Sequence, residues 1–344
     1  MTEPTDWRLF LGTRVPHDGI TRLPDPPPWR PYRTDHVVAE RHIPADDQLP
    51  PAMQQRGRTF QATPEIVEMV NAALYLRRPL LVTGNPGTGK SSLVDAVAWE
   101  LRLGEPLRWS ITSRSTLRDG LYTYDAVGRL HATQQALTER EAGQPVPDEL
   151  PMSQFLRLGP LGTALLPTQV PRALLIDEID KADLDLPNDL LNVLEEGEFE
   201  IPELARQKDA TVPVRLHGGG PGDTYPVTGG RVQARQFPLV VFTSNGEREF
   251  PPAFLRRCLR LQMPDPCQDV TRLTQVVQAH LAEYFQGELA AEVQQRIADF
   301  AQRAATERLA TDQLLNAVLL VVGRAGLPAE QKEALVKRVT QPLG

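Results

Sequence analysis

The residues best suited to chemistry lie between Gly84 and Ser91, where glycines, a lysine and a serine follow a short apolar run. Glycines let the backbone curl so that its N–H groups point inward at a phosphate. Lys90 can reach the β- and γ-phosphates of a nucleotide, and the Ser91 hydroxyl can ligate Mg²⁺. The spacing is that of a P-loop, and it predicts phosphate binding by Gly84, Asn85, Pro86, Gly87, Thr88, Gly89, Lys90, Ser91 and Ser92.

The segments on either side of this loop decide between a phosphate site and a plain glycine-proline turn. The run 80–82 is apolar throughout, which is typical of a strand buried on both faces. After the loop, Leu93, Val97 and Leu101 recur four apart, and Gly104 can end the helix that they predict. A strand, a glycine-rich loop and a helix are the context that phosphate binding requires, so the plain turn is disfavoured.

Two adjacent acids follow a second buried strand, predicted over 173–176. The tip of a strand next to the P-loop is where a Mg²⁺–phosphate complex lies in an open α/β sheet. We therefore expect Asp177 to hold the metal and Glu178 to polarise a water for attack on the γ-phosphate. The alternative is an acidic strand end in solvent, which the P-loop upstream disfavours.

Polar residues also follow a later strand, predicted over 237–245. Asn245 at its tip could hydrogen-bond the attacking water or the γ-phosphate, or it could cap a turn. Arg256 and Arg257 end a short helical segment, where they need either an anionic partner or solvent.

Composition limits the class of protein. The chain has 344 residues, enough for two or three domains, and a formal net charge of −7, which argues against a dominant electrostatic grip on nucleic acid. Cys258 and Cys267 provide neither a disulfide framework nor a zinc spacing, which fits a reducing cytoplasm. We expect no signal peptide and no membrane span, because no apolar run approaches the length that either requires.

The chain divides into three predicted regions. Residues 1–55 are rich in proline and carry Trp7 and Trp29, so we expect an extended arm that packs along the domain or along a neighbouring subunit, against the alternative of a flexible tail. Residues 56–266 form the α/β domain, and 267–344 have the periodicity of a four-helix region.

Several local features are expected within the α/β domain. A helix is predicted over 64–76, with Thr63 as its N-cap. Arg58, Thr59 and Phe60, just before it, could contact an adenine ring or form a plain loop. A helix interrupted by an insertion is expected over 112–136, a surface loop over 140–152 and a hairpin over 203–236.

Taken together, these motifs resemble an AAA+ ATPase, most closely the MoxR branch. The resemblance covers about 56–325 and rests on the segments 84–91, 174–180 and 254–258 and on the strand ending at Asn245. It implies a five-stranded parallel sheet of order 5-1-4-3-2 with a C-terminal helical lid. It also implies ATP and Mg²⁺ bound between the subunits of a homo-oligomeric ring, usually a hexamer.

The resemblance also implies roles for particular residues. Asn245 falls at the sensor 1 position, and Arg257, with Arg256 beside it, falls at the position of the arginine finger that reaches the ATP of the adjacent subunit. The segments 112–136 and 203–236 resemble inserts that face the pore or the substrate. The sensor 2 arginine of the family is absent, with Gln313 at its position and Arg308 nearby.

The resulting hypothesis is an ATPase that remodels or activates a partner protein, with Glu178, Lys90, Asn245, Arg257 and Arg256 as catalytic residues. MoxR-like proteins often act with a protein that contains a von Willebrand A domain, so the resemblance implies a client of this kind. The missing sensor 2 arginine motivates an alternative, an ATP-gated adaptor with little hydrolysis that recruits or restrains an effector. A DNA-directed AAA+ motor and a small-molecule kinase are weaker rivals, because neither a basic stripe nor a substrate lid is evident.

Overall fold

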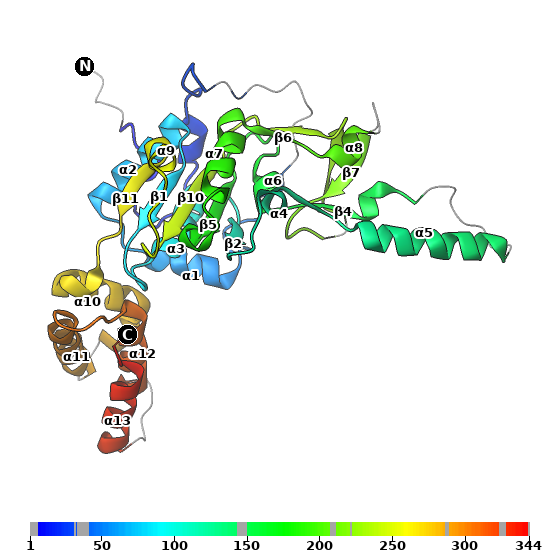
Figure 1. The fold of residues 1–344 in the computed structure, drawn as a ribbon. Helices are drawn as coiled ribbons and strands as arrows, with labels where there is room; N and C mark the ends of the chain where they lie inside the picture. Colours follow the sequence, from blue (N-terminus) through cyan, green and yellow to red (C-terminus); the bar gives the residue numbers. More distant parts are fainter. Residues whose placement is uncertain are drawn as a thin grey trace, which may run out of the picture.

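The protein contains a parallel sheet, a second mixed sheet and a C-terminal group of helices (Figure 1). The computed structural model describes residues 6–30, 32, 41–142, 150–206, 211–220, 222–285, 289–322 and 328–342. Within these parts of the chain, no helix combines the length and the apolarity needed to cross a bilayer.

The parallel sheet carries the predicted strands. It consists of β1 (Leu80–Thr83), β2 (Leu107–Ser110), β5 (Ala173–Asp177), β10 (Leu239–Ser244) and β11 (Leu259–Gln262), in the order β11-β1-β10-β5-β2. Counted along the chain among these five strands alone, the order is the predicted 5-1-4-3-2. The apolar runs are explained by burial on both faces, since Leu80 and Val82 belong to one core and Leu81 to the other.

Helices cover both faces of this sheet. On one face α2 (Pro64–Leu76) and α3 (Lys90–Glu100) supply the core, and α1 (Pro51–Thr59) packs against α3. On the other face lie α4 (Leu117–Leu121), α6 (Pro160–Ala164), α7 (Leu186–Glu196) and α9 (Pro252–Arg257). The predicted helix 64–76 is confirmed, and the Thr63 side chain accepts a hydrogen bond from the Ile66 N–H. Gly197 caps α7 with a φ of 69°, in the left-handed region.

The second sheet was not predicted as a sheet. Its order is β3-β4-β7-β8-β9-β6, and its strands are β3 (Tyr122–Tyr124), β4 (Leu156–Leu158), β6 (Glu198–Glu200), β7 (Thr211–Arg215), β8 (Thr224–Thr228) and β9 (Arg231–Gln233). The hairpin expected in 203–236 is present as β7 and β8, with Val214 opposite Tyr225. The short helical turn η2 (Met152–Gln154) precedes β4, and α8 (Pro202–Ala205) connects β6 to β7, whereas η3 (Ile179–Lys181) follows β5 of the parallel sheet.

The segment 112–136 differs from the expected interrupted helix. The chain forms α4, then β3, then α5 (Ala126–Glu141), and α5 projects away from the body of the molecule (Figure 1). The Asp125 side chain caps α5 by accepting a hydrogen bond from the Gly128 N–H. Of the surface loop expected over 140–152, residues 143–149 lie outside the described part of the chain.

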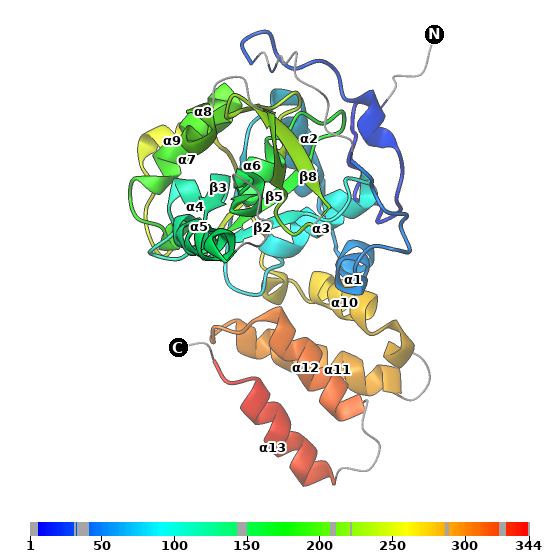
Figure 2. The same cartoon turned by 90° about the vertical axis from the view of Figure 1, so that its right-hand side faces the viewer.

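The C-terminal region is helical, as predicted. It contains η4 (Pro266–Gln268), α10 (Val270–His280), η5 (Ala282–Phe285), α11 (Leu289–Ala304), α12 (Thr311–Val322) and α13 (Ala329–Val339). These helices have a core of their own, which includes Leu273, Ile297 and Phe300. They lie together beyond one end of the parallel sheet (Figure 2).

The N-terminal segment is docked on the α/β domain by buried polar side chains. Leu9 and Phe10 are each 1% exposed, and the carboxamide oxygen of Asn71 accepts hydrogen bonds from both of their N–H groups. The buried carboxylate of Glu100 accepts three more, from the N–H groups of Leu11, Gly12 and Arg14. After η1 (Gly19–Arg22) the segment leads on to α1 (Figure 2), a helix that was not predicted.

Candidate nucleotide-binding site

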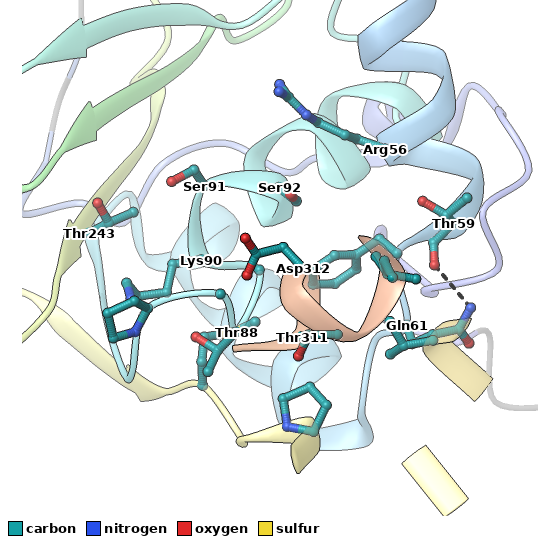
Figure 3. A pocket seen from close by; sticks show the side chains of 18 of the residues that line it. Arg56, Thr59, Gln61, Thr88, Lys90, Ser91, Ser92, Thr243, Thr311 and Asp312 are labelled. Carbon is teal, nitrogen blue, oxygen red and sulfur yellow. Dashed lines mark hydrogen bonds between the residues drawn. The ribbon is translucent and has the colours of Figure 1, made fainter. Parts of the chain in front are cut away.

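A cavity of about 460 Å³ lies between the carboxyl ends of the parallel strands and the C-terminal helices (Figure 3). The loop before α3 and the first turn of α3 contribute Pro86, Gly87, Thr88, Gly89, Lys90, Ser91 and Ser92 to its lining. The tips of β5 and β10 contribute Asp177, Glu178, Thr243 and Asn245. The remaining lining residues come from α1 and the segment after it, from the segment after β11, and from α10 and α12. The residues that the sequence placed at three separate strand ends therefore surround one space.

The loop between β1 and α3 is shaped for an anion. Lys90 is 8% exposed, and its Nζ donates hydrogen bonds to the carbonyl oxygens of Gly84 at 2.7 Å and Asn85 at 2.9 Å. Burial lowers the pKa of Lys90, and the nearby Asp177 carboxylate opposes that shift. Gly89 is the N-cap of α3, so the positive end of the helix faces the cavity. A lysine and a helix N-terminus at one place suit a phosphate group.

Asp177 links the loop to the neighbouring strands. One of its carboxylate oxygens, Oδ1, accepts a hydrogen bond from the Ser91 hydroxyl at 2.9 Å and another from the Thr243 hydroxyl. A carboxylate beside a serine hydroxyl is a set of hard oxygen donors. These residues fit Mg²⁺, which keeps its remaining positions for water and substrate phosphate.

Glu178 adopts an unusual backbone conformation. Its φ of 58° and ψ of 47° lie in the left-handed region, which costs a residue with a side chain about 1–2 kcal/mol. The Glu178 N–H donates to the Thr243 hydroxyl at 2.9 Å, and the carboxylate pairs with Lys181 at 2.7 Å. The turn breaks the alternation of the strand and lets Asp177 and Glu178 both line the cavity.

Asp180 organises the loop that carries Asn245. Its side chain is buried, and Oδ2 accepts hydrogen bonds from the N–H of Asn245 at 3.0 Å and of Glu247 at 3.1 Å. Neither Asp180 nor Thr243 was predicted from the sequence to have a role, yet the Thr243 hydroxyl both accepts and donates hydrogen bonds at the tip of β10. The signal for Thr243 was present, since it is the first hydroxyl residue after the apolar run of β10 and stands two positions before Asn245.

The far end of the cavity offers aromatic and polar contacts. Thr59 at the end of α1 lines it together with Phe60 and Gln61, and the Gln61 Nε2 donates to the Thr59 carbonyl oxygen at 3.0 Å (Figure 3). The Thr59 hydroxyl lies 3.1 Å from Nε2 of His280 in α10. Of the three residues expected to contact an adenine ring, Arg58 lies elsewhere, because its guanidinium stacks on the ring of Trp99.

Comparison with known proteins places this geometry in a family. The sequence profile of the family described as AAA domain (dynein-related subfamily) matches residues 79–258, just over half of the chain. The chain belongs to this AAA family. The matched segment contains the loop of Lys90, both acids after β5 and the tip of β10.

Two solved structures show a distant likeness to this AAA protein. The FIGL-1 AAA domain in complex with ADP is 16% identical to this chain and gives a TM-score of 0.35. The match covers 77% of this chain and 73% of the FIGL-1 chain. NtrX from Brucella abortus, also in complex with ADP, is 14% identical and gives a TM-score of 0.40. The match covers 83% of this chain and 53% of the NtrX chain. The chain thus spans about half the length of NtrX. No curated protein sequence matches it.

Gln313, which the resemblance placed at the sensor 2 position, does not line the cavity. Its Oε1 accepts a hydrogen bond from the Ala310 N–H at 2.9 Å, and its Nε2 donates to the Gln341 carbonyl oxygen at 2.7 Å. Thr311 and Asp312 line the cavity instead (Figure 3). The start of α12 approaches the loop closely, since a Cβ added to Gly87 would lie 2.7 Å from that of Ala310.

Two of the basic residues that line the cavity were not predicted from the sequence. Arg272, in α10, has its pKa lowered by burial, and Asp269 and Asp265 act in the opposite direction. Arg56, in α1, pairs with the buried Asp95 at 3.2 Å. Neither residue follows a motif, so no sequence signal marked them.

The structure places Arg256 and Arg257 away from this cavity, at the end of α9. Arg257 Nε lies 3.0 Å from Glu195 Oε1 at the end of α7, and both side chains are 35% exposed. The Arg78 guanidinium donates hydrogen bonds to the carbonyl oxygens of Arg256 and Arg257. Because Arg78 precedes β1, these arginines lie at the amino ends of the strands, opposite the cavity.

Proposed function

We propose that this AAA protein binds ATP with Mg²⁺ in the cavity, hydrolyses it at the subunit interfaces of a ring, and uses the cycle to remodel or activate a partner protein. One observation carries the proposal. Lys90, Ser91, Asp177, Glu178 and Asn245 come from three strand ends and line a single cavity. This set matches what phosphoryl transfer to water requires, namely phosphate binding, metal binding and an oriented water.

Each residue then has a distinct task. Lys90 and the N–H groups at the start of α3 bind the phosphates, while Ser91 and Asp177 hold the metal. When bound, Mg²⁺ neutralises charge on the phosphate oxygens. Glu178 accepts the proton of the attacking water, and Asn245 orients that water from a loop fixed by Asp180.

The arginines of α9 serve a neighbouring subunit in this proposal. Arg257 is partly exposed and lies opposite the cavity of its own chain, so its charge is available to another copy. A head-to-tail interface repeated around a ring would bring Arg257, with Arg256 beside it, to the next cavity. An arginine supplied in this way stabilises the charge of the transition state.

Mixing two inactive variants tests the shared site. Glu178→Gln removes the base but keeps the arginine, and Arg257→Ala does the reverse. Random mixing of equal amounts of the two should create intact sites at roughly a quarter of head-to-tail interfaces. We expect ATPase activity to return on mixing, and the wild-type rate per subunit to rise with protein concentration. A flat rate per subunit and no recovery on mixing would contradict the shared site.

A second candidate is an ATP-gated adaptor that hydrolyses little and recruits or restrains an effector. The observation that favours it is the start of α12, where Asp312 lines the cavity and neither Gln313 nor Arg308 does. A carboxylate at this place offers no stabilisation to a γ-phosphate. Single-turnover measurements on the assembled protein decide between the candidates, because an adaptor would retain bound ATP over many minutes.

The partner that we propose is a protein in the cytoplasm, of the kind that MoxR-like ATPases engage through a von Willebrand A domain. The resemblance to that branch supports the proposal. A pull-down with Glu178→Gln, which should bind ATP without releasing it as ADP, is the direct test. Enrichment that requires ATP and disappears with Lys90→Ala would support a nucleotide-dependent client.

A further inference from the structure

The carboxylate of Glu195 lies between two arginines from distant parts of the chain. Its Oε1 is 3.0 Å from Arg257 Nε and 3.9 Å from Arg30 Nη2. The side chain of Arg30 is only 13% exposed, against 35% for both Glu195 and Arg257. One carboxylate cannot fully compensate two cations, so the two arginines compete for it.

Arg30 is held beside Glu195 by the next described residue, Tyr32. The Tyr32 hydroxyl donates to the Leu194 carbonyl oxygen at 2.6 Å, and its N–H donates to the Arg30 carbonyl oxygen at 3.0 Å. The ring lies over Gly197, where a Cβ would come within 2.2 Å of it, and contacts Phe237. The N-terminal arm is therefore fitted to the end of α7.

The guanidinium of Arg30 is incompletely satisfied. Within the described residues, its Nη1 is buried and has no hydrogen-bond partner. A buried guanidinium nitrogen without an acceptor is costly, and a closer approach of Glu195 would relieve that cost. Arg30 is thus placed to pair more closely with the Glu195 carboxylate whenever Arg257 leaves that carboxylate.

Arg257 can leave Glu195 without moving its backbone. Arg78 holds the carbonyl oxygens of Arg256 and Arg257 from the start of β1. Among the described residues, the ion pair with Glu195 is the polar contact of the Arg257 side chain within its own subunit. A turn of the side chain is therefore enough to present the guanidinium elsewhere.

We propose that Arg30 is a positioning residue for Arg257, which it helps to release from Glu195 towards the phosphates of a neighbouring subunit. This inference rests on the proposed role of Arg257 at a shared ATP site. While Arg257 stays on Glu195, the charge of Arg30 weakens that pair. When Arg257 leaves, Arg30 takes over Glu195, so the carboxylate is not left uncompensated at the end of α7.

The proposal predicts that two substitutions change kcat in opposite directions. Arg30→Gln removes the competitor, so Arg257 should be held more tightly and kcat of the assembled protein should fall, with nucleotide affinity unchanged. Glu195→Gln removes the carboxylate, so it should restore activity in the Arg30→Gln background. The expected changes are about twofold to fivefold, the size of an ion-pair coupling near the surface. The matched control is Arg8→Gln, an arm arginine that pairs with Asp6 instead.

A chemical readout separates this proposal from the proposed function. Phenylglyoxal modifies accessible arginines, and peptide mass spectrometry reports the rate at Arg257 in the full-length protein without any need for hydrolysis. We expect slower modification in Arg30→Gln, faster modification in Glu195→Gln, and the wild-type rate in Arg8→Gln. If the wild type does not hydrolyse ATP, the proposed function fails while the modification rates still decide the role of Arg30.

Two results would overturn the role of Arg30. One is an Arg257 modification rate in Arg30→Gln equal to that of the wild type. The other is a double variant, Arg30→Gln with Glu195→Gln, whose fold-loss of kcat is the product of the two single fold-losses, so that the corresponding free energies add. Additive losses would mean that both residues only support the local fold.

Discussion

Charged side chains are paired differently at the two ends of the parallel sheet. At the carboxyl ends, Lys90, Asp177 and Asp180 are engaged with the backbone or with neighbouring side chains around one cavity. At the amino ends, Arg257 and Arg30 share the single carboxylate of Glu195. One end contains an assembled set of groups, whereas at the other, within the described residues, two arginines lie beside one carboxylate.

Under the proposed function, this difference would divide one catalytic site between two copies of the chain. The groups that bind phosphate and activate water need fixed positions, and buried hydrogen bonds provide them. An arginine that must reach another molecule needs the reverse, a partner that it can leave. The following predictions test this contrast, beginning with the largest effect.

Arg257→Ala should produce the largest loss. Removing an arginine that stabilises the transition state from a neighbouring subunit should lower kcat of the assembled protein by about 10³–10⁵. Nucleotide binding should remain, because Arg257 is remote from the cavity of its own chain. Steady-state ATPase assays and nucleotide titration measure the two effects. Arg256→Ala shows which arginine acts, and Arg260→Ala, an exposed residue of β11, is the control.

Glu178→Gln should have the next largest effect. Loss of the general base should lower kcat by about 10²–10⁴, while ATP binding persists because Lys90 and the loop before α3 are unchanged. Rapid-quench measurement of bound ATP and ADP tests this expectation. Glu196→Gln, an exposed glutamate at the end of α7, should behave as the wild type. Normal turnover by Glu178→Gln would refute the assignment of the base.

Asp180→Ala should have a smaller, mixed effect. It leaves the N–H groups of Asn245 and Glu247 without their acceptor, which should lower the free energy of unfolding by about 1–3 kcal/mol. Activity should also fall, because the Asn245 loop loses its support. Urea unfolding and ATPase assays measure both quantities, with Asp185→Ala as the exposed control. A loss of stability with full activity would remove Asn245 from the mechanism.

Tyr32→Phe should have the smallest effect. The substitution removes one hydrogen bond to the Leu194 carbonyl oxygen and should lower the free energy of unfolding by about 0.5–1.5 kcal/mol. The ring still packs on Phe237, so the arm should remain docked. Urea unfolding measures the change, and Tyr124→Phe, a partly exposed tyrosine of β3, is the control. An unchanged stability would show that packing alone docks this part of the arm.

The elements around the cavity could be predicted because their signals are local. A buried strand, a glycine-rich loop and an amphipathic helix each have their own pattern, and β1, α3 and β5 follow those patterns. The motif residues Lys90 and Asp177 lie at strand ends, where chain direction alone determines which edge they share.

The rest of the structure depends on contacts that sequence patterns do not encode. The strands β3, β4 and β6 have three residues each, too few to show an alternating pattern. Helix α1 is strongly polar and contains Gly57, which packs closely on Trp99. Gln313 was predicted to reach the nucleotide from its position along the chain. That position does not determine which residues at the start of α12 face the loop at Gly87.

The close approach of Ala310 to Gly87 has a further consequence. The cavity is enclosed jointly by the sheet domain and the C-terminal helices, so its shape depends on the angle between them. Any hinge motion near Pro264 and Pro266 must open or narrow the enclosure. If the helical part rotates, that rotation and the exchange of a bound molecule would be coupled, and a bulkier residue at position 87 would collide with Ala310 and push the two parts away from each other.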